Sequence, residues 1–86
     1  MRNGLVIYSN GDKYWYKNDK LHRENGPAVE SPNGDKAWWI NGKCHRVNGP
    51  ALEYADGKKV WYINGTRLDC SSQEEFERLM KLGSFW

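Results

Sequence analysis

Residues 33–53 read NGDKAWWINGKCHRVNGPALE and repeat residues 10–30, which read NGDKYWYKNDKLHRENGPAVE. Laid over one another without a gap, residues 10–32 and 33–55 share 14 identical residues in 23 positions, where composition alone would give on the order of one or two. A third copy starts at DGKK, residues 56–59, so the step from residue 33 to residue 56 equals the step from residue 10 to residue 33. A period of this length predicts an array of stacked structural repeats.

The repeats divide the chain into units. Its 86 residues leave room for one small core, so we expect a single domain over residues 1–86. The third copy loses the pattern after Gly65, because Leu68 and Asp69 stand where the first two copies have His-Arg. The predicted units are a truncated starting strand over residues 3–9, repeats over 10–32, 33–55 and 56–70, and a helical cap and tail over 71–86.

Within each repeat the local sequence is typical of β-hairpins. Asn-Gly pairs, which supply the positive φ angles of tight turns, lie at residues 10–11, 33–34, 41–42 and 64–65. The aromatic and β-branched runs between them predict strands at residues 5–8, 14–16, 37–40 and 60–63. Proline-led return strands follow at residues 27–30 and 50–54. We therefore predict a mainly β fold, a single antiparallel β-meander sheet of stacked hairpin repeats with a C-terminal capping α-helix.

The capping helix is predicted from about Ser72 to Leu82. A capping box and a charge gradient mark its two ends, in Ser71, Ser72, Glu74 and Glu75 at the start and Arg78, Lys81 and Gly83 at the end. Phe76, Leu79 and Met80 make one apolar stripe at helical spacing. We expect this stripe to cover the last strands of the sheet, the alternative being contact with a partner helix.

Strand alternation sorts the aromatic residues into two rows on opposite faces. The predicted core consists of one row and two helix residues, namely Trp15, Trp38, Trp61, Phe76 and Leu79. Because a helix of about three turns cannot cover both faces of a sheet of six or more strands, the second row should stay partly exposed unless loops or a second subunit cover it. The candidate binding surface is this second row with two neighbouring arginines, namely Tyr16, Trp39, Tyr62, Arg23 and Arg46.

The first predicted strand raises the question of self-association. Residues 5–8, LVIY, are four consecutive apolar residues, and as the first strand they lack a neighbour on one side. Such an edge is a template for pairing with a second copy. We expect a homodimer through the Leu5–Tyr8 edge, with coverage by Phe85 and Trp86 or by the first loop as the alternative.

Composition and charge narrow the class of protein. Thirteen Lys and Arg face eleven Asp and Glu, a net charge of +2, and the two signs alternate without the basic stripe typical of nucleic-acid binders. No apolar run is long enough for a membrane span. Two cysteines are fewer than a disulfide-dependent domain of this size usually carries. We expect free thiols and a cytoplasmic location, in the host cytoplasm if a phage encodes the chain.

Cys44, His45, Cys70 and His22 invite a zinc hypothesis, but their spacing lacks the close ligand pairs of structural zinc sites. Cys44 beside His45 is the one candidate for a nucleophile and its base, and adjacent strand residues point to opposite faces. We therefore predict no metal, no cofactor, no catalytic residue and no enzymatic activity. The two histidines are expected to hydrogen-bond the backbone of turns and to hold their loops.

The repeat frame NGDKYWYKNDKLHRENG and its copy NGDKAWWINGKCHRVNG resemble the MORN repeat over residues 3 to about 70. The resemblance is closest to divergent MORN-like proteins of bacteriophages, large DNA viruses and bacteria, some of which are described as antitoxin components. It implies an elongated antiparallel sheet that acts in protein contacts. Arg23 and Arg46 stand where the MORN loop has glycine, so lipid binding is not implied.

We therefore expect a small binding protein that acts through protein–protein contacts, as a phage-encoded inhibitor of a host enzyme or defence factor, or as an antitoxin. Two alternatives stay open. One is a binder of nucleotides or single-stranded nucleic acid that stacks bases on aromatic residues beside Lys and Arg. The other is a structural homo-oligomer.

Overall fold

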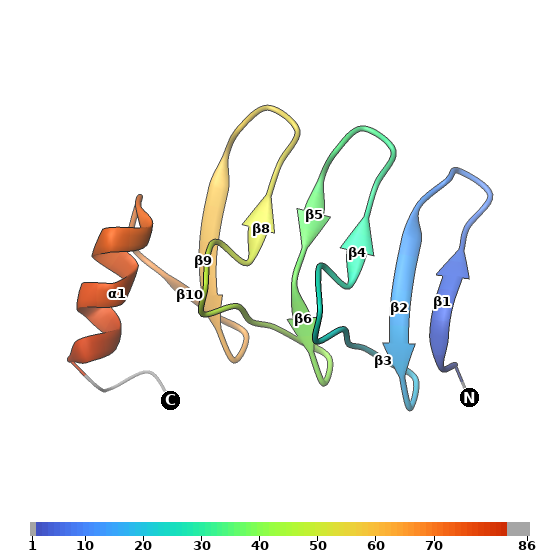
Figure 1. Cartoon of the computed structure of the whole chain (residues 1–86), viewed down its shortest axis with the longest axis horizontal. Coiled ribbons are helices and arrows are strands. Elements are labelled where there is room, and N and C mark those ends of the chain that lie inside the picture. The colour runs from blue at the N-terminus through green and yellow to red at the C-terminus, as the bar shows by residue number, and fades with distance from the viewer. Residues whose placement is uncertain (1, 83–86) are drawn as a thin grey trace.

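The computed structural model describes residues 2–82. Its elements, in chain order, are β1 (Gly4–Ile7), β2 (Lys13–Lys17), β3 (Lys20–Leu21), β4 (Val29–Glu30), β5 (Lys36–Ala37), β6 (Trp39–Ile40), β7 (Lys43–Cys44), β8 (Leu52–Glu53), β9 (Lys59–Ile63), β10 (Thr66–Leu68) and α1 (Gln73–Lys81). Figure 1 shows the hairpins standing side by side, with β1 at one end of the row and α1 at the other.

The sheet is an antiparallel meander, as predicted. Its strand order is β1-β2-β4-β5-β8-β9-β10, with β3 paired to β2 and a separate pair formed by β6 and β7. The molecule measures 41 × 29 × 17 Å, and its strands stand side by side in a single layer (Figure 1). A one-layer sheet must draw its cover from loops, from its own long side chains and from α1.

Two groups of strands are shorter than the sequence predicts. The segment 37–40 is interrupted at Trp38, which has no residue paired opposite it in the ladder, whereas Trp15 pairs with Leu5 and Trp61 pairs with Leu68. The backbone of Trp38 still bonds to Ala51 and His45. The return strands begin at Val29 and Leu52, two residues after their prolines. Proline has no N–H to give to a ladder, and the carbonyls of Pro27 and Pro50 accept hydrogen bonds from arginine side chains instead.

The capping helix forms where the sequence predicts it. Ser72 is the N-cap, and its Oγ accepts the backbone N–H of Glu75 at 3.1 Å. The Glu75 carboxylate in turn accepts the backbone N–H and the hydroxyl of Ser71, which lowers the pKa of Glu75. Phe76, 1% exposed, packs with Trp61, Ile63 and Leu68, so α1 closes the last repeat.

The core is smaller than predicted. Trp61 and Phe76 are buried, but Trp15, Trp38 and Leu79 are only half-buried. The buried side chain of α1, Phe76, packs only on residues of the last repeat, and the two earlier tryptophans lie under single arginine side chains instead. Within residues 2–82 the buried hydrophobic residues are Ala28, Cys44, Ala51, Trp61, Ile63, Leu68 and Phe76.

The sequence also led to expectations for the cysteines, for membrane spans and for the C-terminal residues. Both cysteines are free thiols. No helix in the described part of the chain has the length and apolar character that a membrane crossing requires. The predicted helix stop at Gly83 and the covering of the first strand by Phe85 and Trp86 lie outside the described residues.

Candidate binding surface

The register of the strands assigns each residue to one of two faces of the sheet. Trp15 pairs with Leu5 and Lys13 with Ile7, and these residues share a face, while Tyr14 and Tyr16 pair with Val6 and Gly4 and lie on the other. We call the first the Trp face; it carries Trp15, Trp38 and Trp61. We call the second the aromatic face; it carries Tyr8, Tyr14, Tyr16, Trp39, Tyr54 and Tyr62.

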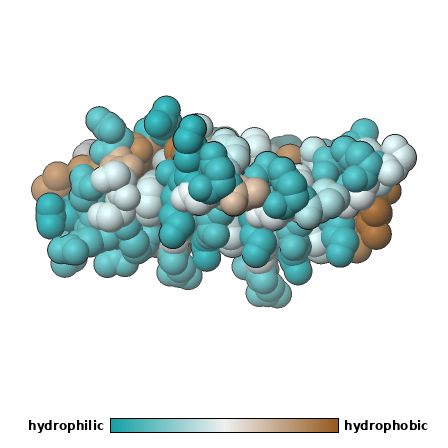
Figure 2. Space-filling model, turned by 90° about the horizontal axis from the view of Figure 1, so that it is seen from above, coloured by the Kyte–Doolittle hydropathy of each residue, from teal (hydrophilic) through white to brown (hydrophobic). Residues whose placement is uncertain are grey.

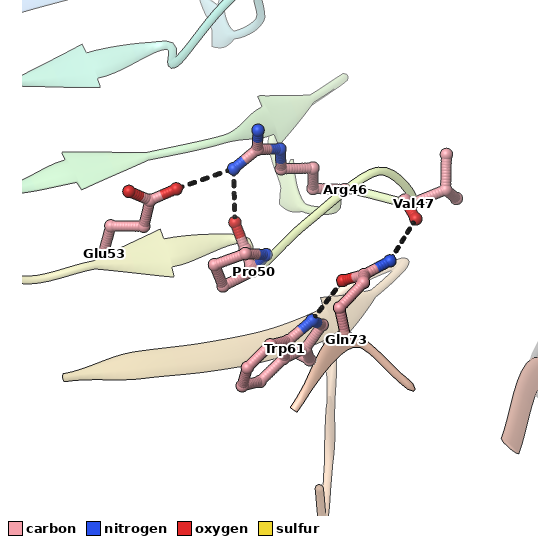
Figure 3. Close-up of polar contacts among 6 residues, drawn as sticks. All are labelled: Arg46, Val47, Pro50, Glu53, Trp61 and Gln73. Atoms are coloured by element: carbon pink, nitrogen blue, oxygen red, sulfur yellow. Dashed lines mark hydrogen bonds and ion pairs between the residues drawn. The ribbon is translucent and has the colours of Figure 1, made fainter. Parts of the chain in front are cut away.

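An arginine covers the tryptophan in each of the first two repeats. The Arg46 guanidinium lies 3.7 Å from the centre of the Trp38 ring, and its Nη1 donates to the carbonyl of Pro50 at 3.0 Å and to Glu53 Oε2 at 2.8 Å (Figure 3). Such a stack combines a cation–π contact with charge-assisted hydrogen bonds. We call this unit the arginine clamp.

The first repeat builds the same clamp one repeat period earlier in the chain. Arg23 lies 3.8 Å from the Trp15 ring centre and donates to the carbonyl of Pro27 and to Glu30 at 3.1 and 3.0 Å. A glycine makes room for each guanidinium, since a Cβ on Gly49 would lie 2.8 Å from Cζ of Arg46. The NGP motif of the repeat is therefore part of the clamp.

The third repeat replaces the clamp with the helix. Asp69 stands at the arginine position, and the indole Nε1 of Trp61 donates instead to Gln73 Oε1 at 2.7 Å. Gln73 Nε2 donates to the carbonyl of Val47 at 3.2 Å, as Figure 3 shows, and so ties α1 to the loop of the second repeat. Each of the three tryptophans on the Trp face is thus covered, two by clamps and one by the helix.

The histidines join one repeat to the next. Nδ1 of His22 accepts the backbone N–H of Asn41, and Nδ1 of His45 accepts that of Asn64, both at 3.0 Å. Asn41 and Asn64 have φ of 50° and 49°, the left-handed conformation that suits asparagine in a tight turn. The expected hydrogen bond to turn backbone is confirmed, but the turn belongs to the following repeat rather than to the loop that the histidine begins.

The thiol beside His45 has the character of a core residue. Cys44 is 6% exposed, and burial raises its pKa to about 11, so the thiol stays protonated at neutral pH and lacks the nucleophilic thiolate form. Nδ1 of His45 is occupied by Asn64. Among residues 2–82 no three His, Cys, Asp or Glu side chains gather closely enough to hold a metal ion.

The aromatic face has a tyrosine cluster at its N-terminal end. The rings of Tyr8 and Tyr14 meet edge to face at 4.8 Å, and those of Tyr14 and Tyr16 stack at 6.3 Å. The hydroxyls of Tyr8 and Tyr16 lie 2.8 Å apart, and Arg2 Nη1 donates to Tyr16 at 3.1 Å. The hydrogen bond with Tyr16 raises the pKa of Tyr8, so the Tyr8 hydroxyl stays protonated at neutral pH.

Two residues of this face were missed as site residues by the sequence analysis. Tyr8 and Tyr54 are 38% and 43% exposed, more than the half-buried Tyr16, Trp39 and Tyr62. They stand two repeat periods apart, each just before a hairpin turn. That spacing is the signal that could have identified them, because two repeat periods return a residue to the same position on the sheet.

The two arginines of the predicted surface need correction. Arg23 and Arg46 belong to the Trp face and are held there by their clamps, so they do not stand beside Tyr16, Trp39 and Tyr62 as the sequence analysis expected. They border a groove of about 410 Å³ between successive loops, with Glu24, Trp38, His45 and Val47 among its other lining residues. Its walls are the side chains that hold the repeats together.

Comparisons with protein-family models, with curated proteins and with solved structures found no match. The case for a function therefore rests on the geometry of the two faces and on the repeat pattern. The tryptophans of the Trp face lie under clamps and helix, and the exposed aromatic side chains Tyr8 and Tyr54 lie on the aromatic face.

Proposed function

We propose that this chain is a non-enzymatic binding module that contacts another protein through its aromatic face. The observation that carries the proposal is the difference between the two faces in what covers their aromatic side chains. The three tryptophans of the Trp face lie under two arginine clamps and α1, while six aromatic side chains line the opposite face, with Tyr8 and Tyr54 exposed. Tyrosine and tryptophan are enriched at protein interfaces, where a large rigid ring is buried at low entropic cost.

The alternative of base stacking on the same rings is less well supported. A single-strand binder needs cations along the stacking platform to follow the phosphate backbone. Arg23 and Arg46 are engaged by Glu30 and Glu53 on the other face. The aromatic face itself carries Arg2, 5.0 Å from the Tyr16 ring centre, and Arg67, which pairs with Tyr62. Cations beside separate rings do not form the continuous basic groove that follows a phosphate backbone, and this favours a protein partner over a polyanion.

The resemblance to MORN-like proteins supports a narrower form of the proposal. A chain of this size that acts only by occupying a surface suits an inhibitor of a host enzyme or defence factor, or an antitoxin. We propose a cytoplasmic location for it, and the two free thiols support a reducing compartment. These narrower statements rest on the family resemblance and on fold-level analogy.

Capture from nuclease-treated lysate of the cell that makes the chain tests the proposal, with Tyr54→Ser compared with the parent and with Val47→Ser. Both substituted side chains are exposed, and Val47 lies in the loop that covers the Trp face. We expect a captured protein whose yield falls with Tyr54→Ser, is unchanged with Val47→Ser and is similar at about 50 and about 200 mM salt.

A fluorescently labelled single-stranded oligonucleotide provides the second arm of the test. Binding of the oligonucleotide that weakens steeply between these two salt concentrations and falls with Tyr54→Ser would favour the nucleic-acid alternative. Equal capture by the parent and both variants would show that the aromatic face does not contact the captured protein.

A further inference from the structure

Within residues 2–82, only β2 pairs with β1, and the other edge of β1 carries a defined set of backbone groups. The N–H of Tyr8 donates to the carbonyl of Asp12, and the carbonyl of Tyr8 accepts from Gly11, so the backbone of Tyr8 faces β2. Arg2 likewise directs its carbonyl to Asp19. Backbone groups alternate along a strand, and those of Leu5 and Ile7 therefore point away from β2, where no other strand of residues 2–82 pairs with them.

The side chains at this edge differ from their counterparts in the interior repeats. When the repeat frame is extended back by one period, Leu5 stands at the position of Ala28, which is fully buried, and Ile7 at the position of Glu30. Glu30 pairs with Arg23, a partner that Ile7 lacks. Leu5 and Ile7 are 47% and 60% exposed, and Figure 2 shows hydrophobic side chains at the end of the molecule that β1 forms.

A solvent-facing edge strand usually carries charges or proline that discourage pairing. Residues 3–11 contain neither. At the position where the repeat pattern places a glutamate, this edge carries an isoleucine instead. The lack of charge and proline in residues 3–11 and the isoleucine in place of glutamate both favour an edge that is covered by an apolar strand rather than by water.

We propose that a second copy of this chain pairs with β1 in antiparallel fashion about a two-fold axis at Val6. This register sets Leu5 of one copy opposite Ile7 of the other, twice, and these are the residues whose outward N–H and C=O groups can bond across the interface. All four side chains lie on the Trp face and form one apolar patch. The sheets of the two copies then form one continuous antiparallel sheet, joined by the β1–β1 pair.

The antiparallel arrangement continues the pattern of the sheet, in which every pair of neighbouring strands within residues 2–82 is antiparallel. The proposal does not rest on the use of the aromatic face by another protein, and it would stand if that use were disproved.

Sedimentation velocity across a micromolar dilution series tests the dimer with the full chain. Ile7→Glu places at residue 7 the glutamate that the next two repeats carry at the equivalent positions, Glu30 and Glu53. Val47→Glu is the control, since Val47 is exposed but distant from β1. We expect the parent and Val47→Glu to dimerise equally. We expect Ile7→Glu to raise the dimer dissociation constant by more than about tenfold while the monomer stays folded by circular dichroism.

Disulfide trapping tests the register. A non-hydrogen-bonded antiparallel pair holds its Cα atoms about 4.5 Å apart, within disulfide reach, so Val6→Cys should cross-link two copies under mild oxidation. Ile7→Cys, which faces Leu5, should cross-link far more slowly, and the parent with Cys44 and Cys70 serves as background. A monomer at all concentrations, a dimer that Ile7→Glu leaves intact, or faster trapping through Ile7→Cys would each overturn the proposal.

Discussion

At the scale of single residues, the arginine clamp explains how a one-layer sheet protects its tryptophans. Arg46 and Glu53 are one-quarter and one-third exposed, so the ion pair is shielded from water more than a surface pair, and the guanidinium also covers an indole ring. Loss of Arg46 would leave both Glu53 and the carbonyl of Pro50 without their donor. The clamp is therefore expected to contribute measurably to stability.

We predict that Arg46→Met lowers the free energy of unfolding by about 2–3 kcal/mol, the sum of a cation–π contact and two charge-assisted hydrogen bonds in a partly shielded site. Urea unfolding followed by tryptophan fluorescence measures the loss. Combining Arg46→Met with Glu53→Gln should recover part of it, because the unpaired carboxylate is removed. A loss under about 0.5 kcal/mol would mean that the clamp does not stabilise the fold.

The histidine links predict a dependence of stability on pH. Burial lowers the pKa of His45 below its usual 6.5, so the unfolded chain takes up a proton at higher pH than the folded chain does. Stability should be complete above pH 6.5 and should fall as the pH drops below that value toward the folded pKa. Protonated Nδ1 would also face the N–H of Asn64, donor against donor.

Chemical unfolding between pH 7.5 and 5 checks this expectation. His45→Gln, whose side-chain oxygen can accept the same N–H, should flatten the pH profile over that range. Parallel profiles for the parent and His45→Gln would show that another group is responsible.

The residue scale also shows where sequence reasoning stops. The shared face of Tyr16, Trp39 and Tyr62 could be predicted, because the repeat period and strand alternation fix it. The clamps could not, because Arg46 reaches back to Trp38 only after an irregular loop has folded over the sheet. Neither periodicity nor turn chemistry encodes that path.

At the scale of elements, the sequence signals for turns and caps were stronger than those for strand length. The Asn-Gly turns and the Ser72 cap form where predicted. The break at Trp38 divides the segment between two partners, since β5 pairs with β8 and β6 pairs with β7, and the local sequence does not indicate such a change of partner. The starting strand and the repeats therefore differ in what covers them, although their sequences follow one frame.

We predict that α1 stabilises the last repeat through one side chain. Phe76→Ala should cost about 3–5 kcal/mol, the range for a fully buried aromatic residue, because Phe76 is 1% exposed among Trp61, Ile63 and Leu68. Leu82→Ala at the end of the same helix is the control, since Leu82 is 72% exposed and should change the unfolding midpoint little. Similar losses from the two substitutions would contradict the assignment of Phe76 as the contact that closes the sheet.

At the scale of the whole molecule, the two faces and the two ends have different tasks. One end is closed by α1, and the other exposes the β1 edge. One face is held by clamps and helix, and the other presents aromatic rings. Pairing through β1 would double the length of the aromatic face without covering it, because Leu5 and Ile7 point to the Trp face. A dimer would then offer its partner two copies of the same surface.

The central claim is that the aromatic face, and not the Trp face, meets a protein partner. A photo-crosslinking amino acid placed at Tyr54 and, in a second variant, at Val47 tests it directly in the cell that makes the chain. Both positions are exposed, and they lie on opposite sides of the sheet. We expect a discrete protein adduct from position 54 that resists nuclease and is absent from position 47. Adducts from position 47 alone, or nuclease-sensitive adducts from position 54, would contradict the account.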